Sequence, residues 1–193
     1  EVSYEVADRE LSTHALKIRE SGADSVIIYS TITHCVGLIK EMAKVGYRPK
    51  VFASFPLGDR HTMYRLLGDL WEGAHYNVTG GVPGEPDADR IVDILLKQEP
   101  KLKGRESLAL LGATAMMATV EGMKRAGKNL SREGFIEAMD SIKGWAPEKL
   151  TPAITWDPNR HHGGNPIRMM QALKAADTSF KVITDYQPFP AHF

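Results

Sequence analysis

The sequence predicts an α/β fold in which a parallel sheet carries helices on both faces. Short runs of β-branched and apolar residues alternate with amphipathic segments in the first half of the chain, in the order strand, helix, strand, helix, strand. Two of the helical segments end at Gly22 and Gly46, so two strand–helix units of similar length follow each other. This order predicts right-handed crossovers between parallel strands.

The expected strands of this half share short, apolar or alternating runs and cover residues 1–6, 23–30, 49–55 and 73–80. The expected helices have apolar residues at helical spacing and cover residues 10–22 and 34–46, with a short helix or turn at 60–71. The run at 23–30 does not alternate, which is typical of a strand covered on both faces. The first half is therefore expected to form the sheet.

The second half is expected to be rich in helix. The stretch GGVPGEPDAD at 80–89 combines glycines, prolines and acids and indicates a connection between lobes. Three helices are then predicted, at 87–98, 106–127 and 131–144, and the second is apolar almost all round, which predicts burial. Ser131 is the expected N-cap of the third helix. The remaining expectations are strands at 153–156, 167–174 and 180–187, followed by an irregular tail at 188–193.

The composition argues against several function classes. Lys plus Arg and Asp plus Glu both number 24, so there is no basic excess to neutralise a nucleic-acid backbone, and we expect no nucleic-acid partner. No apolar run is long enough to span a bilayer. Cys35 is the single cysteine, which excludes an intramolecular disulfide and any CxxC motif. We expect the Met116–Met117 and Met169–Met170 pairs to fill the core.

The stretch ITWDPNRHHGGNP at 154–166 invites a metal or catalytic reading, but its spacing favours a turn. Adjacent side chains of an extended segment point to opposite sides, so His161 and His162 do not make a ligand pair. Asp157 opens a DPN sequence that is typical of a turn, and Arg160 is expected to be a solvated loop residue. A metal-dependent hydrolase using Asp157, His161 and His162 is kept as the less favoured alternative.

Other catalytic motifs are weak or missing. Neighbouring residues on a helix point about 100° apart, so His34 and Cys35 are not expected to form a thiol–imidazole pair, and a small buried thiol is favoured. The GGVPGEP stretch lacks the Lys-Ser/Thr of a phosphate loop. No GxSxG, HExxH or GxGxxG is present. We therefore predict no catalytic residues and no metal site.

The ends of two predicted strands hold the candidate ligand site. Ligands of open parallel sheets bind beyond the carboxyl ends of the strands. The candidates after the first of these strands carry hydroxyl groups, and they are Tyr29, Ser30 and Thr31. The candidates after the next strand are Ser54, Phe55 and Pro56. The alternative is that all six are ordinary loop residues.

Four stretches resemble the branched-chain amino-acid type of solute-binding protein, the extracytoplasmic receptor of ABC importers. They are residues 11–30, 38–54, 112–144 and 153–164. The third is the most specific. In it a long predicted helix is followed by AGKNLSRE and then by a helix that contains IEAMDSIK, which is the order of these motifs in the family. The resemblance covers nearly the whole chain, and it implies that the histidine turn is a structural feature between strands.

The resemblance implies a type I periplasmic-binding-protein fold with two α/β lobes, of which this chain would be the C-terminal part only. On that basis residues 1–76 are expected to belong to the second lobe, residues 77–145 to return into the first lobe, and residues 146–193 to cross back. An incomplete two-lobe architecture would leave sheet edges and apolar faces exposed. We therefore expect oligomers or a swapped assembly if the piece is alone.

The resemblance also bears on the ligand. In amino-acid-binding members a hydroxyl-bearing strand end contacts the ligand, and an acid on the next strand end pairs with its ammonium. Here that position is Phe55, the nearest acid is Asp59, and Ala113 replaces a tyrosine common in the family. A desolvated ammonium without a counter-charge is costly. The expected ligand is thus a small carboxylate with an aromatic or apolar body.

The implied role is periplasmic capture of that small molecule in an interlobe cleft, followed by docking on a membrane ABC permease. No bond is made or broken, so the chain is not expected to be an enzyme, and no cofactor is implied. The alternative within the same fold is a ligand-sensing regulatory domain.

Overall fold

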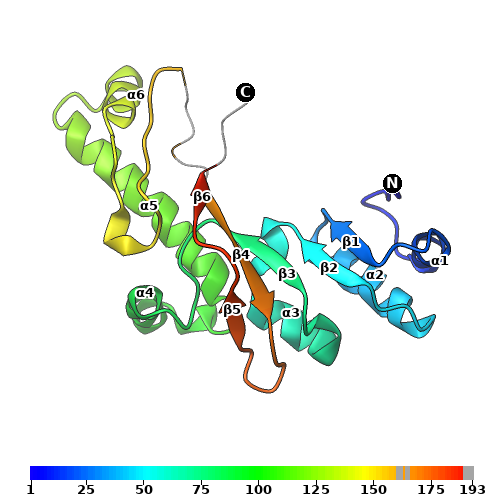
Figure 1. Cartoon of the computed structure of the whole chain (residues 1–193). Coiled ribbons are helices and arrows are strands. Elements are labelled where there is room, and N and C mark those ends of the chain that lie inside the picture. The colour runs from blue at the N-terminus through cyan, green and yellow to red at the C-terminus, as the bar shows by residue number, and fades with distance from the viewer. Residues whose placement is uncertain (160–162, 164–165, 189–193) are drawn as a thin grey trace. The chain divides into compact units, whose positions relative to one another are not determined.

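The computed structural model describes residues 1–159, 163 and 166–188, and the chain divides into two compact units. Unit 1 comprises Glu1–Val78 and Arg168–Asp185. Unit 2 comprises Thr79–Ile167 and Tyr186–Phe193. Unit 1 holds most of the sheet and unit 2 holds three helices (Figure 1).

The sheet has the order β1-β2-β3-β4-β5 and is mixed. Its elements are β1 (Ser25–Ile28), β2 (Lys50–Ala53), β3 (His75–Val78), β4 (Pro166–Ala172) and β5 (Phe180–Val182). The first three strands are parallel, whereas β4 runs antiparallel to β3 and β5 antiparallel to β4. The short β6 (Gln187–Pro188) pairs with the start of β4. The parallel pairing predicted for the first half is confirmed for β1 to β3, whereas β4 and β5 form an antiparallel hairpin that joins the sheet beside β3.

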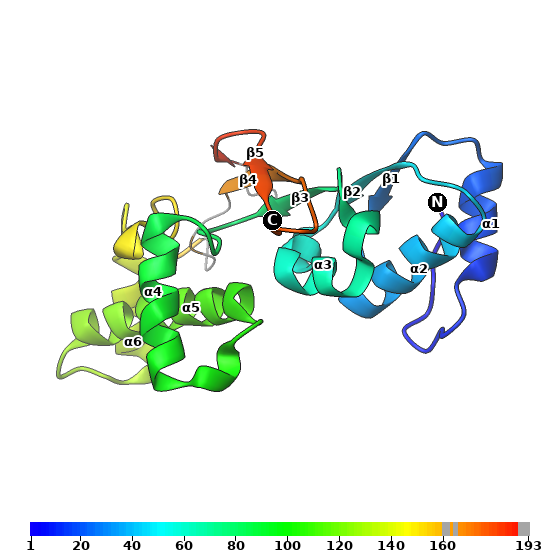
Figure 2. The same cartoon turned by 90° about the horizontal axis from the view of Figure 1, so that it is seen from below.

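One face of the sheet forms the core of unit 1. Ile28, Ala53, Tyr76 and Met170 are register partners from β1 to β4, and all four are buried. The helices of this unit are α1 (Ser12–Glu20), α2 (Ile32–Lys44) and α3 (Arg60–Leu67). Figure 2 shows α2 and α3 on one side of β1–β3. Gly22 and Gly46, with φ of 68° and 71°, follow α1 and α2 as the sequence predicts.

The opposite face is open at β1. Ile27 is 84% exposed there, and its neighbour Phe52 is half-buried and stacks on His75 with ring centroids 4.9 Å apart. The prediction that 23–30 is covered on both faces is therefore wrong in the described part of the chain. A run of apolar letters does not distinguish a doubly covered strand from one with an open face.

The expected strand at residues 1–6 is also wrong. No strand lies there, and the segment ends in a turn in which the Asp8 amide donates to Glu5 O at 3.0 Å. A strand needs a partner for its backbone groups, and β1 pairs only with β2 among the described strands. The alternating pattern alone does not supply that partner.

Unit 2 contains α4 (Pro86–Gln98), α5 (Glu106–Ala126) and α6 (Arg132–Asp140). Its core cluster joins α4, α5 and the loop near Leu150, and consists of Ala88, Ile91, Val92, Leu110 and Leu150. Ser131 caps α6 as predicted, because its side chain accepts a hydrogen bond from the Gly134 amide at 3.0 Å.

Helix α5 is not buried all round, which corrects the sequence-based expectation. Only Leu110 and Gly122 are buried, whereas Leu108, Leu111 and Met116 are exposed. Met116 is therefore not core filler, although Met117 packs against the unit 2 core and Met170 is fully buried. The segment 153–156 forms only an isolated bridge between Trp145 and Ile154.

The C-terminal expectations are partly met. The predicted strands at 167–174 and 180–187 correspond to β4 and to the separate strands β5 and β6. Residues 189–193 of the expected tail lie outside the described residues.

Candidate functional site

The carboxyl ends of β1 and β2 lie side by side, as the sequence predicts. Ile28 and Ala53 are the last residues of these parallel strands and are register partners. Immediately beyond them, the Ser54 amide donates a hydrogen bond to Ile28 O at 3.0 Å. The two candidate groups, residues 29–31 and 54–56, therefore leave the sheet at the same edge. This edge is where open parallel sheets bind ligands.

The three hydroxyl groups after β1 differ from one another in their hydrogen-bond partners. Tyr29 is 87% exposed, and its phenol has no partner in the described part of the chain. Ser30 Oγ donates to Thr31 O at 2.9 Å. Thr31 is the N-cap of α2: its side chain accepts from the His34 amide and lies 2.7 Å from His34 Nδ1. The Tyr29 phenol is thus the hydroxyl of this group that is open to a ligand.

The second strand end combines an exposed ring with buried polar atoms. Phe55 is 37% exposed and begins a 3-10 turn, Phe55–Gly58, with Pro56 also exposed. Ser54 Oγ is buried without a hydrogen-bond partner among the described residues. Asp59 is only 4% exposed and caps α3 through the Thr62 amide at 3.5 Å. The single carboxylate of residues 54–59 is therefore buried and engaged as a helix cap.

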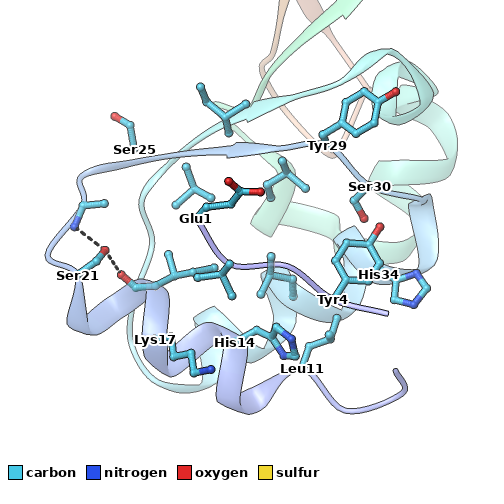
Figure 3. A pocket seen from close by; sticks show the side chains of 17 residues that line it. Glu1, Tyr4, Leu11, His14, Lys17, Ser21, Ser25, Tyr29, Ser30 and His34 are labelled. Atoms are coloured by element: carbon cyan, nitrogen blue, oxygen red, sulfur yellow. Dashed lines mark hydrogen bonds between the residues drawn. The ribbon is translucent and has the colours of Figure 1, made fainter. Parts of the chain in front are cut away.

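A cavity of about 280 Å³ adjoins the first strand end (Figure 3). Tyr29 and Ser30 line it, together with side chains of α1 and of the N-terminal segment. Tyr4 stacks on His34 with ring centroids 4.5 Å apart, and its hydroxyl lies 3.4 Å from the Thr31 amide. The His34 Nε2 atom is buried and has no partner among the described residues. The cavity gives the strand end open space and a hydrogen-bonding imidazole.

Sequence reasoning missed Tyr4 and His34. It treated His34 only as a neighbour of Cys35 and assigned residues 1–6 to a strand. The available signal was the spacing of Thr31 and His34. An N-cap side chain accepts a hydrogen bond from the amide of the third helical residue, and His34 is that residue when Thr31 is the N-cap. The stack of Tyr4 on His34 joins segments 30 residues apart and left no signal in the sequence.

Cys35 is a buried free thiol, as predicted. Burial raises the pKa of Cys35 from 9.0 to about 12. The thiolate form is therefore scarce at neutral pH, and the group is a poor nucleophile.

The DPN turn is confirmed at its start. Asp157 Oδ1 accepts a hydrogen bond from the Asn159 amide at 2.9 Å, which is an Asx turn. Arg160, His161 and His162 lie outside the described residues. Across residues 1–159, 163 and 166–188, no group of three His, Cys, Asp or Glu side chains comes together as a metal site would require. No helix in that part is both long and apolar enough to cross a membrane.

A sequence model of the periplasmic binding proteins matches residues 1–177, which is most of the chain. The chain belongs to the periplasmic binding protein family. No curated protein matches it. Among solved structures, it is similar to the solute-binding protein of an ABC transporter from R. palustris in complex with 4-hydroxybenzoate. The TM-score is 0.76 at 16% identity, and the match covers 97% of this chain and 50% of the other.

Two further solved structures show the same fold. One is a branched-chain amino-acid ABC transporter protein from Thermus thermophilus with bound valine, with a TM-score of 0.75, 14% identity, and coverage of 97% and 52% of the two chains. The other is a fatty-acid ABC transporter substrate-binding protein from Thermomonospora curvata, with a TM-score of 0.74, 15% identity, and coverage of 96% and 49%. The chain thus has the type I periplasmic binding protein fold and spans about half the length of these structures.

Proposed function

We propose that this periplasmic binding protein chain contributes the β1 and β2 strand ends to a receptor that captures a small carboxylate with an aromatic or apolar body for ABC import. The observation that carries the proposal is that an exposed Phe55 ring and an exposed Tyr29 phenol follow two adjoining strand ends, and that the acid nearest to Phe55 in sequence, Asp59, is buried. The proposed contact residues are those of the two strand ends, Tyr29, Ser30, Thr31, Ser54, Phe55 and Pro56.

The absence of an exposed acid at the β2 end argues against an α-amino acid. Asp59 is the nearest acid in sequence to Phe55, but it is buried and used as the cap of α3. An ammonium group held beside Phe55 would lose its hydration without gaining a carboxylate from this strand end, which is unfavourable. An aromatic or aliphatic body would instead gain contact with the ring. The solved structures named above include proteins for 4-hydroxybenzoate, a fatty acid and valine, so the shared fold accommodates each of these classes.

The proposed mechanism uses binding energy alone. Residues 1–76 would contribute to one lobe of the receptor, residues 77–145 would return into the other, and residues 146–193 would cross back. Ligand binding between lobes would favour the closed arrangement by hinge motion, and the closed form would dock on a membrane permease. The proposal places the receptor outside the cytoplasm and requires neither a cofactor nor a covalent step.

The test is a thermal-shift screen of the gene product that contains this chain. The panel compares 4-hydroxybenzoate, benzoate and octanoate with leucine and valine. A ligand at one hundred times its dissociation constant stabilises the bound protein by about 2.7 kcal/mol, which is readily measured. Stabilisation by the acids without an amino group supports the proposal, and stabilisation by leucine or valine alone contradicts it.

Two variants locate the site. Phe55→Ala should weaken aromatic-acid binding by about tenfold, because it removes a ring contact and apolar area. Leu66→Ala is the matched control, since Leu66 is 38% exposed on α3 while Phe55 is 37% exposed. Equal affinities of the two variants would place the ligand away from the β2 strand end.

A further inference from the structure

Thr31 lies where the chain passes from β1 into α2, and its amide, carbonyl and hydroxyl groups each have a partner. The carbonyl oxygen accepts hydrogen bonds from the Cys35 amide at 3.0 Å and from Ser30 Oγ at 2.9 Å. The side-chain oxygen accepts one from the His34 amide at 3.5 Å and lies 2.7 Å from His34 Nδ1. The Thr31 amide donates to the Tyr4 hydroxyl at 3.4 Å. The conformation of Thr31 is therefore fixed through all of its polar groups.

The partner of the Thr31 amide comes from an unusual place. In a capping box, a glutamate or glutamine three residues after the Ser or Thr cap accepts the hydrogen bond of the cap's own amide. Here that position holds His34, and its imidazole lies against the Thr31 hydroxyl instead. The acceptor for the amide is the hydroxyl of Tyr4, which is 27 residues earlier in the chain. The task of the capping-box residue is thus divided between His34 and Tyr4.

The rings of Tyr4 and His34 support each other. They stack with centroids 4.5 Å apart and an angle of 27° between their planes (Figure 3). His34 is only 7% exposed, so its ring has little freedom to move. The imidazole contacts the Thr31 hydroxyl at one edge, and its face holds the ring whose hydroxyl accepts the Thr31 amide. Loss of the Tyr4 hydroxyl therefore removes one of the contacts that fix Thr31.

The segment that carries the first group of candidate ligand contacts is held at both ends. At one end, the oxygen of Ile28 accepts the Ser54 amide of the neighbouring strand end at 3.0 Å. At the other end, Thr31 is held by Tyr4 and His34. Only Tyr29 and Ser30 lie between these two points. A two-residue span between fixed ends has few conformations, so the exposed phenol of Tyr29 is presented from a defined backbone.

We propose that Tyr4 and His34 are positioning residues of the ligand site and act on it through Thr31. A receptor whose free strand end already has the bound arrangement loses no affinity to ordering it. When the strand end can move, only the fraction of molecules in the right arrangement binds, and the apparent affinity falls by that fraction. The inference rests on the proposed function for the place and the class of the ligand.

The first test compares affinities for 4-hydroxybenzoate by calorimetric titration of the gene product that contains this chain. Tyr4→Phe keeps the stacked ring but removes the acceptor, and should weaken binding by about fivefold, the effect of one lost hydrogen bond on the competent fraction. Adding His34→Gln to Tyr4→Phe should recover most of the affinity, because glutamine at this position completes a capping box.

Ser131→Ala is the matched control, since it removes the cap of α6 and should leave the affinity unchanged. This control separates positioning from a general loss of stability. The proposal is overturned if Tyr4→Phe binds as the wild type does, if the double variant is no better than Tyr4→Phe, or if Ser131→Ala weakens binding equally.

The second test separates this inference from the proposed ligand. Hydrogen exchange of the ligand-free protein should be faster at the Thr31 amide in Tyr4→Phe than in the wild type, and slow again in the double variant with His34→Gln. If the wild type binds leucine and not the acid, the proposed ligand class is wrong, and the affinity comparison is made with leucine. If the wild type binds neither, exchange alone decides. An unchanged rate at the Thr31 amide in Tyr4→Phe refutes the positioning role, whichever ligand binds.

Discussion

The contact between α5 and α6 can be tested with two glycines on the same helix. Both Gly112 and Gly122 lie inside α5, and alanine in a helix interior is favoured over glycine by about 1 kcal/mol. A Cβ at position 112 would meet nothing within 4 Å. A Cβ at position 122 would lie 2.8 Å from Phe135 Cε2 and closer still to Met139 Sδ. Gly112→Ala should therefore be stabilising, and Gly122→Ala should not.

The size of the difference follows from packing. Both variants gain the same helix preference, so it cancels in the comparison. Overpacking of a tight core position costs about 1–3 kcal/mol, part of which Met139 relieves by moving its flexible end. The two variants should thus differ by about 2 kcal/mol. For a chain of this length, that corresponds to about 4–8 °C in the melting temperature.

The assay is thermal unfolding of both variants at one protein concentration, followed by circular dichroism. Combining Gly122→Ala with Phe135→Leu should recover part of the loss, because the ring atom that the new Cβ meets is removed. If Gly122→Ala is as stabilising as Gly112→Ala, the close approach of α5 and α6 is wrong.

Three further predictions concern single side chains. Burial raises the pKa of Cys35 from 9.0 to about 12 in the folded state. The contribution of this thiol to stability is therefore complete below pH 9 and is lost as the pH rises to about 12. The free energy of unfolding in urea should fall more steeply above pH 9 for the wild type than for Cys35→Ala. Ser131→Ala removes the cap of α6 and should cost about 1 kcal/mol in urea unfolding, whereas Ser131→Asp should cost little. Arg60→Met should lower the free energy of unfolding by about 2–3 kcal/mol, measured by calorimetry. The reason is that Arg60 Nε donates to Thr178 O at 2.9 Å and the guanidinium lies 4.4 Å from the Phe180 ring centroid. A loss below about 0.5 kcal/mol would contradict this account.

The elements of the fold were mostly predictable because their signals are local. The apolar runs of β1, β2 and β3, the glycines that follow α1 and α2, and the Ser131 cap each depend on a few neighbouring residues. The convergence of the β1 and β2 ends followed from parallel pairing. These predictions required no knowledge of distant contacts.

The failures are of another kind. The alternating run at residues 1–6 did not become a strand because a strand is defined by its partner, which the pattern does not contain. The prediction that α5 is buried was wrong, because a run of apolar residues does not show which other part of the chain covers them. The open face at Ile27 was missed for the same reason.

The candidate site was predicted in position but not in detail. The sequence placed hydroxyl groups after β1, yet only the structure shows that Thr31 is committed to His34 and that Ser30 is bonded to the backbone. It also could not show that Asp59 is turned inward as a helix cap, which removes the nearest acid from Phe55.

Hydrogen–deuterium exchange of the gene product that contains this chain, with and without 4-hydroxybenzoate, tests the central claim most directly. The account predicts that the acid slows exchange at residues 29–31 and 54–58, and that leucine does not. Protection of these segments by leucine but not by the acid, or protection by the acid only elsewhere, would contradict the proposed site and its ligand class.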